Sequence, residues 1–145
     1  MNKKSVHIYR IASKYFFIPT ASLTGTYGKD IEPITFLDED DGFYKMGKYL
    51  HDAFYNCKIV DPQTIEGVSK KFLEISKTKS SKKLIEIAIY GRADLIGNQI
   101  TIRRIGANKK YKAYMVDLGI PPVHLDLNTP NEAIGLAIRQ LFSAE

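Results

Sequence analysis

The sequence is poor in the residues that most often carry catalysis or cross-links. Its 145 residues include one cysteine, Cys57, and three histidines. One cysteine excludes an internal disulfide, so we expect a reducing compartment, the cytoplasm. The motifs HExxH and GxSxG and the glycine-rich phosphate-binding loops are also missing from the sequence. It therefore offers no signature of a zinc protease, a serine hydrolase or a nucleotide-binding enzyme.

A cysteine–histidine nucleophile has no local support either. His51 and Cys57 belong to one predicted helix, and their separation along it places them on roughly opposite faces. We therefore predict that the protein is not an enzyme, and that it has no catalytic residues, no cofactor and no small-molecule substrate.

Long apolar runs are missing as well. No segment approaches the roughly 20 apolar residues of a transmembrane helix. The first residues, MNKKSVHIYRIASKYFF, are basic and then apolar, as in a signal peptide. However, Arg10 and Lys14 interrupt the apolar part, and no small-residue cleavage site follows it. We expect a cytoplasmic protein without a membrane partner.

Charge is plentiful but unevenly placed. The net charge is +5 and the pI is about 9.2. Basic residues gather near positions 3–4, 77–83 and 103–112, whereas positions 38–41 are four consecutive carboxylates. Basic proteins of this size often bind nucleic acid, but solvated loops and helix faces explain the basic clusters more simply. The local acidic run is the less expected feature.

The most informative feature is a repeat. The segments LDEDDGFYKMGKYLHDAF and LDLNTPNEAIGLAIRQLF align without a gap at a constant offset of 88 residues (126 − 38). The matched positions are Leu37 with Leu125, Asp38 with Asp126, Asp40 with Asn128, Met46 with Ile134, Gly47 with Gly135, Leu50 with Ile138 and Phe54 with Phe142. Each copy has a short apolar run followed by apolar residues at helical spacing, so the repeat predicts a strand, a turn and a helix.

Both predicted helices have visible starts. In the second copy Thr129 is the expected N-cap, Pro130 opens the helix and Glu132 completes a capping box. In the first copy either Asp40 or Asp41 is the expected N-cap.

Each of these helices also has a glycine one turn in, Gly47 or Gly135. Glycine costs a helix roughly 1 kcal/mol relative to alanine. Its presence in both copies therefore needs a packing reason, namely close approach to the strand beneath or to the other helix. We predict a structural role for both glycines.

The other elements follow from periodicity and turn residues. We predict strands at residues 5–12, 14–20, 84–90, 99–105 and 111–118, and a third helix over residues 61–75. Residues 91–98 are a predicted loop and residues 106–110 a predicted hairpin turn. The sum is one α+β domain of residues 1–145, a mostly antiparallel sheet with about three helices packed on it.

Two candidate sites have simpler structural explanations. Asp38, Asp40, Asp126 and Asn128 could bind a divalent cation if the two copies met, but strand ends and helix caps explain these residues, so we predict no metal. The hairpin RRIGANKKYK could bind nucleic acid, with its tyrosines stacking on bases. Its candidate residues are Arg103, Arg104, Lys109, Lys110, Lys112, Tyr111 and Tyr114. A small basic nucleic-acid-binding protein is accordingly the alternative function.

The favoured contact surface is the acidic run with its aromatic neighbour, EDDGFY. Tight protein inhibition needs about 800 Å² of preformed surface per partner, with aromatic anchors inside a polar rim. We predict that Glu39, Asp40, Asp41 and Tyr44 contact a basic cleft on a protein partner. Tyr27, in the loop GTYG, is a further candidate contact.

The sequence resembles the immunity proteins of bacterial contact-dependent growth inhibition systems. The matching segments are KMGKYLHDAF, NEAIGLAIRQLF, KSSKKL and ITIRR, and they lie between positions 15 and 144. The resemblance implies a cytoplasmic, non-enzymatic inhibitor that binds the C-terminal toxin domain, often a nuclease, of a large surface effector. It transfers no functional residue by position. Nuclease inhibitors tend to be acidic, whereas this chain is basic overall, so either the toxin is not a nuclease or substrate mimicry is confined to residues 38–41.

Overall fold

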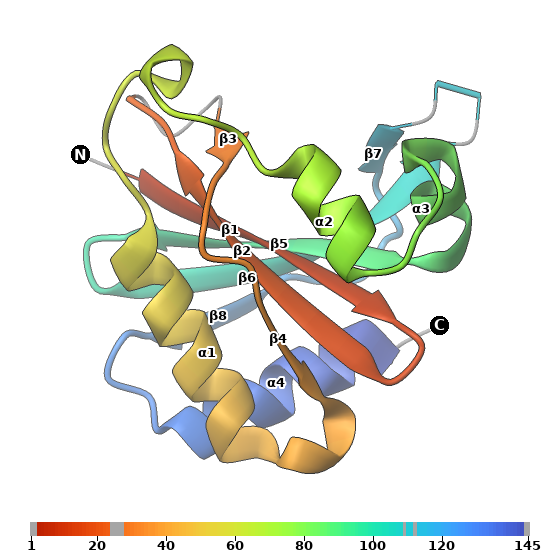
Figure 1. Cartoon of the computed structure of the whole chain (residues 1–145). Coiled ribbons are helices and arrows are strands. Elements are labelled where there is room, and N and C mark those ends of the chain that lie inside the picture. Colours follow the sequence, from red (N-terminus) through yellow and green to blue (C-terminus); the bar gives the residue numbers. More distant parts are fainter. Residues whose placement is uncertain (1–2, 24–27, 109, 112, 144–145) are drawn as a thin grey trace.

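The computed structural model describes residues 3–23, 28–108, 110–111 and 113–143 (Figure 1). In chain order its elements are β1 (Lys3–Ile11), β2 (Lys14–Ala21), β3 (Lys29–Asp30), β4 (Thr35–Asp38), a 3₁₀ turn (Glu39–Asp41), α1 (Phe43–Asn56), a 3₁₀ turn (Pro62–Thr64), α2 (Ser69–Ile75), α3 (Ser81–Ile87), β5 (Ile89–Ile96), β6 (Gln99–Asn108), β7 (Ala113–Val116), β8 (Val123–Asp126) and α4 (Asn131–Ser143).

All eight strands belong to one sheet. Its order is β3-β2-β1-β5-β6-β7, with β4 also paired to β2 and β8 also paired to β6. Every pair of named strands is antiparallel. The predicted α+β class and antiparallel sheet are therefore confirmed, with four helices in the described part of the chain instead of about three.

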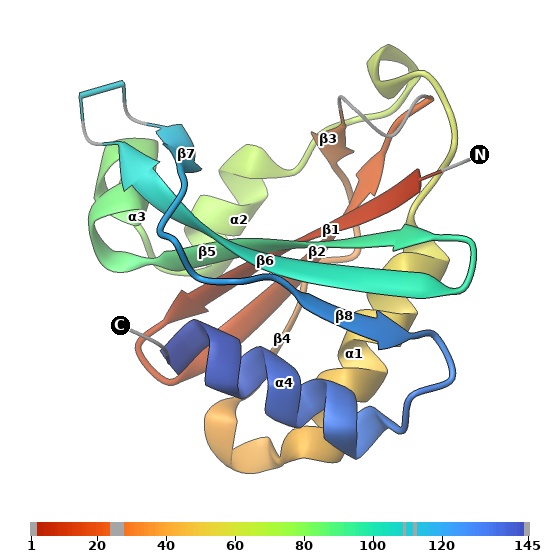
Figure 2. The same cartoon turned by 180° about the vertical axis from the view of Figure 1, so that it is seen from behind.

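The helices cover the two faces of the sheet separately. Helices α1 and α4 lie against one face, and α2 and α3 lie against the opposite face (Figures 1 and 2). Strand alternation supplies both cores: Val6 and Ile8 face α1 and α4, whereas Tyr9 packs with Phe72 of α2. The larger core lies under α1 and α4.

The repeat is a structural duplication. Strands β4 and β8 have equivalent bounds at the offset of the sequence repeat, and each leads to one of the two packed helices, α1 and α4. Each follows a hairpin, β1–β2 or β5–β6, and pairs with its second strand. Residues 3–56 and 89–143 therefore form two copies of one strand–strand–strand–helix unit.

A pseudo-twofold axis relates the two units. The axis passes between β1 and β5. Val6 lies opposite Ala93 and Ile8 lies opposite Gly91, and exchanging the two units turns one of these pairs into the other, so the register between the strands is unchanged. His7 and Arg92 form the central pair of this register. The helices cross on the same axis (Figure 2).

The two helical glycines form that crossing. A Cβ atom on Gly47 would lie 2.7 Å from the carbonyl carbon of Asn131 in α4, and still closer to its oxygen. A Cβ atom on Gly135 would meet Phe43 of α1 at the same distance. The contact is thus reciprocal, and it brings the two helix backbones against each other, as the axis requires.

The segment that joins the two units differs most from prediction. Asp61 caps as expected by accepting from the Gln63 backbone N–H at 3.0 Å, but the helix stops after one turn and α2 begins only at Ser69. Between them, the Val68 N–H donates to the Asp30 carbonyl at 3.1 Å. This bond to β3 competes with helical hydrogen bonding and keeps the segment extended.

The predicted strand 84–90 and loop 91–98 are also wrong. Ser80 caps a helix by accepting from the Lys83 N–H at 3.2 Å, so residues 81–87 form α3, with Leu84 and Ile85 buried. Strand β5 then runs to Ile96. The polar residues of this segment led to the prediction of a loop. In the sheet, however, the Asp94 carboxylate accepts a hydrogen bond from the Ser5 hydroxyl at 2.6 Å.

Three boundaries need smaller corrections. Neither Asp40 nor Asp41 caps α1, whose N-cap is Gly42 with φ of 99°. Helix α4 begins at Asn131, because the Pro130 carbonyl accepts the first helical bonds from residues 133 and 134. Strand β6 extends into the predicted hairpin turn of residues 106–110 and ends at Asn108. No helix in the described part of the chain is long and apolar enough to span a membrane.

Candidate protein-binding surface

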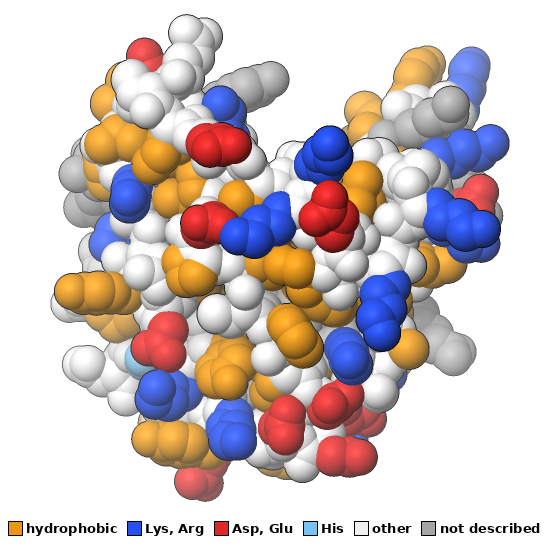
Figure 3. Space-filling model, viewed as in Figure 1, with side chains coloured by type: hydrophobic (Ala, Val, Ile, Leu, Met, Phe, Trp, Pro, Cys, Tyr) orange, Lys and Arg blue, Asp and Glu red, His pale blue; other side chains and the backbone are white. Residues whose placement is uncertain are grey.

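The acidic run forms an exposed turn at the entrance to α1. The Asp38 N–H donates to the Asp41 carboxylate at 2.8 Å, which closes the 3₁₀ turn. Asp40 and Asp41 are exposed, and Tyr44 is 54% exposed in the first turn of α1. Acidic side chains gather over this turn at the lower edge of the molecule (Figure 3). Their charge also favours the helix that follows, because the N-terminus of a helix is partially positive.

Glu39 differs from its neighbours, since it is held inside an ion-pair network. Its carboxylate accepts from Arg139 at 2.8 Å and from Arg10 at 3.4 Å, and only a quarter of its side chain is exposed. The Glu39 N–H also donates to the Ser13 carbonyl at 2.8 Å. The predicted patch is therefore divided: Glu39 fixes the turn, and the aspartates face solvent.

The same network holds the C-terminus of α4. Arg10 donates to the Phe142 carbonyl at 3.2 Å, and Arg104 donates to the Leu141 carbonyl at 3.5 Å. Cations are stabilising at the partially negative end of a helix. Burial and the nearby charge of Arg10 lower the pKa of Arg104. Arg104, predicted as part of a nucleic-acid surface, thus lies against α4.

The rest of the predicted basic hairpin is also divided. Arg103 and Lys110 are exposed, and Tyr111 is 65% exposed with the Lys110 amine over its ring at 5.5 Å. Tyr114 instead packs on Tyr90 at 4.5 Å between ring centroids and donates to the Leu84 carbonyl at 3.1 Å. Lys109 and Lys112 lie outside the described residues, as does Tyr27. The described hairpin residues that were predicted to share one nucleic-acid surface therefore have different surroundings.

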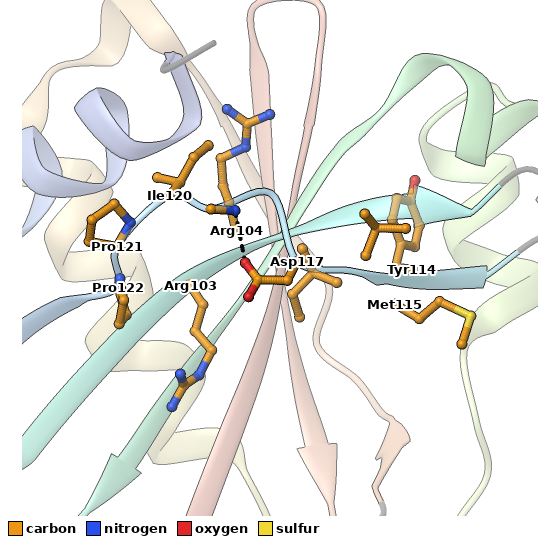
Figure 4. A pocket seen from close by; sticks show the side chains of 11 residues that line it. Arg103, Arg104, Tyr114, Met115, Asp117, Ile120, Pro121 and Pro122 are labelled. Atoms are coloured by element: carbon orange, nitrogen blue, oxygen red, sulfur yellow. Dashed lines mark hydrogen bonds between the residues drawn. The ribbon is translucent and has the colours of Figure 1, made fainter.

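A groove of about 580 Å³ lies beside this hairpin, where the chain leaves β7 for β8. Arg103 and Arg104 point away from each other at its wall, while Ile120 and Pro121 border it farther along (Figure 4). Met115, 60% exposed, also lines the groove. Arg103, Arg104 and Tyr114 line this groove and were predicted together from the sequence, whereas its apolar lining was not, because residues 111–118 carried no signal beyond that of a strand.

The candidate metal ligands are not assembled with others into a metal site. Asp38 ends β4 and Asp126 ends β8, two strands that pair with opposite arms of the sheet. Among the residues that the structure describes, no group of three or more His, Cys, Asp or Glu could hold a metal ion. Instead, the Asp126 carbonyl accepts from the Thr129 N–H at 3.0 Å, in the turn that leads to α4.

Comparison with known proteins gives a structural match. No family model and no curated protein matches the chain. A protein of unknown function from Neisseria meningitidis, NMB0488, has a TM-score of 0.76 at 14% identity, covering 98% of this chain and 94% of that chain. A chain of a CdiA-CT/CdiI toxin and immunity complex from Yersinia pseudotuberculosis also has a TM-score of 0.76, at 12% identity, covering 99% and 97%. The three chains share one fold.

Proposed function

We propose that this protein is the immunity protein of a contact-dependent growth inhibition system. It acts in the cytoplasm, where it binds and neutralises the C-terminal toxin domain of a large effector. The observation that supports the proposal is the near-complete structural match to a chain of a toxin and immunity complex. It agrees with the resemblance of the repeated helices to this group of proteins.

In this proposal the protein inhibits by occupying a surface and performs no chemistry. The contact surface is the acidic turn, with Asp40, Asp41 and Tyr44 exposed and Glu39 holding the turn in place. The toxin is a nuclease whose basic cleft receives these carboxylates in place of phosphates. Because the turn is fixed by ion pairs before binding, little conformational entropy is lost on association. Tyr27 is proposed as an additional contact.

The proposal is tested by neutralisation in cells. The reading frame next to this one should encode a large exported protein, and its C-terminal domain should arrest growth when produced alone. Co-production of this chain should restore growth, and the purified pair should form a stable one-to-one complex. A neighbouring frame without such a domain, or a toxic domain that this chain neither binds nor neutralises, would remove the proposal.

The contact surface is tested separately by charge reversal. Asp40→Lys should slow association with that toxin domain, and salt should then change the rate much less, because electrostatic steering acts mainly on association. Glu132→Lys is the matched control, since Glu132 is exposed in the first turn of the equivalent helix, α4. Normal neutralisation by both variants would retain the function and reject the acidic turn as its site.

A further inference from the structure

The sheet face beneath α2 and α3 changes from apolar to polar across three rows of side chains. Tyr9, Tyr90 and Ile105 lie opposite one another on β1, β5 and β6 and pack beneath the helices. Ser5, Asp94 and Thr101 form a polar row four residues away on the same face. Between these rows is a third, His7, Arg92 and Arg103. This third row is hereafter the basic row.

The basic row brings like-signed groups into direct opposition. His7 lies opposite Arg92, and Arg92 lies opposite Arg103, on three adjacent strands. Like charges in directly opposed positions destabilise an antiparallel pair. Two permanently charged arginines in that relation, with a histidine beside them, therefore need a compensating anion.

Only part of that compensation comes from the protein. His7 contacts the Asp30 carboxylate at 2.6 Å, and Arg92 donates to Asp94 at 3.2 Å. Arg103 is exposed, and within the described residues its guanidinium forms no hydrogen bond or ion pair. The outer end of the row is thus, among the described residues, a cation without an ion pair at the wall of the groove next to β7. Asp117 also lines this groove, and its carboxylate accepts from the Gly119 N–H at 2.8 Å (Figure 4).

The position of Arg103 in the second unit differs in burial from the equivalent position in the first unit. Tyr15 and Ile100 are equivalent, because they pair with the matched residues Leu37 and Leu125. It follows that Ile18 and Arg103 are equivalent. Ile18 is fully buried in the core that includes α2, whereas Arg103 is exposed. One unit is thus covered by the joining segment, and the other presents a cation to solvent.

We propose that the basic row, with the adjoining groove, binds an acidic segment of a protein partner. A carboxylate can pair with the Arg103 guanidinium through two parallel hydrogen bonds. Apolar side chains of the same segment would then enter the groove against Met115, Ile120 and Pro121. The row lies on the sheet face opposite α1, so it is a second surface, distinct from the acidic turn and independent of the proposed function.

A protein segment fits this surface better than nucleic acid. Asp30 and Asp94 lie directly beside the basic row. A polynucleotide would place phosphates at regular intervals along the groove, where these carboxylates would repel them. A peptide segment can instead carry a single carboxylate placed at Arg103, with apolar residues elsewhere, so it need not place a negative charge at every position beside Asp30 and Asp94.

The experiment uses a short synthetic peptide of glutamates interrupted by leucines. It should bind the intact protein at low salt and shift the amide NMR signals of β1, β5 and β6. Arg103→Gln should weaken binding by about tenfold, the usual effect of losing a charge-assisted pair, and Arg103→Lys should recover part of the loss. Lys45→Gln, an exposed cation of α1, is the matched control and should bind normally.

Three outcomes would overturn the inference. The first is equal affinity for the intact protein and for Arg103→Gln. The second is tighter, Arg103-dependent binding of a thymidine oligonucleotide of equal charge, which would identify a nucleic-acid site. The third is sedimentation of the protein as a dimer that Arg103→Gln dissociates, which would identify a second copy of the chain as the occupant.

Discussion

Alanine at Gly47 or Gly135 should destabilise the protein, although alanine is the better helix former. At either site the new Cβ would lie 2.7 Å from a backbone carbonyl carbon of the opposite helix. Carbon atoms in contact are normally at least about 3.5 Å apart. A backbone carbonyl cannot rotate away as a side chain can, so α1 and α4 must separate by about an ångström.

The expected cost follows from two opposing terms. Forced overpacking of a core typically costs about 1–3 kcal/mol, and a backbone clash at a helix crossing belongs at the upper end. The higher helix propensity of alanine returns about 1 kcal/mol. We expect the free energy of unfolding to fall by roughly 2 kcal/mol, and Tm by roughly 4–8 °C for a chain of this length.

Urea and thermal unfolding of Gly47→Ala, Gly135→Ala and the double variant would measure this effect. Because both substitutions separate the same two helices, the double variant should lose less than the sum of the single losses. Ala133→Gly, at an exposed position of α4, reports helix propensity without a crossing contact. The reasoning is refuted if either alanine variant is as stable as the native protein or more stable.

Three other perturbations test the network and the buried groups. Glu39→Gln should lower the free energy of unfolding by roughly 1–2 kcal/mol, because two partly buried arginines lose a charged acceptor; unchanged urea unfolding would contradict this. Burial raises the pKa of Tyr114 to about 12. Its contribution to stability is therefore complete below pH 10 and is lost as the pH rises from 10 to 12, so Tyr114→Phe should weaken the loss of stability in that range. Burial also raises the pKa of the Cys57 thiol, so a thiol reagent should modify it only on unfolding, and rapid labelling of folded protein would refute its burial.

The elements that the sequence predicted well are those whose signals are local. Helices α1 and α4 follow from apolar spacing within one element, β1 and β6 follow from alternation, and β2 follows from a short apolar run. The duplication was visible because both copies keep the glycines that their crossing needs. Whether these glycines would meet a strand or a helix depended on tertiary structure, which the sequence left open.

The elements that it predicted badly depend on distant partners. The helix expected from Asp61 is broken by a backbone bond to β3, and the strand expected at residues 84–90 is a helix because Ser80 caps it. Residues 91–98 read as a loop because a charged pair inside a strand is unusual. The pair is satisfied there because Arg92 donates to Asp94 and Ser5, on the neighbouring strand, donates to the same carboxylate.

The candidate site shows the same division. The sequence identified an exposed acidic turn, but could not show that Glu39 pairs with arginines from β1 and α4, 29 and 100 positions away. It likewise grouped Arg103 with Arg104, although successive residues of a strand face opposite sides of a sheet. In both the acidic turn and the basic hairpin, residues adjacent in the sequence were therefore predicted to share a surface that they do not share in the structure.

The duplicated scaffold explains where a binding surface can vary. Near the pseudo-twofold axis each contact is made by both units, as in the crossing of α1 and α4 at Gly47 and Gly135. A substitution there must therefore fit against both units. The acidic turn and the groove beside β7 lie away from that axis, in segments whose two copies already differ: Asp40 corresponds to Asn128, and buried Ile18 corresponds to exposed Arg103. Substitutions at the exposed members of these pairs change surface charge without loading the crossing of α1 and α4, so the proposed contact surfaces can vary while the core is kept.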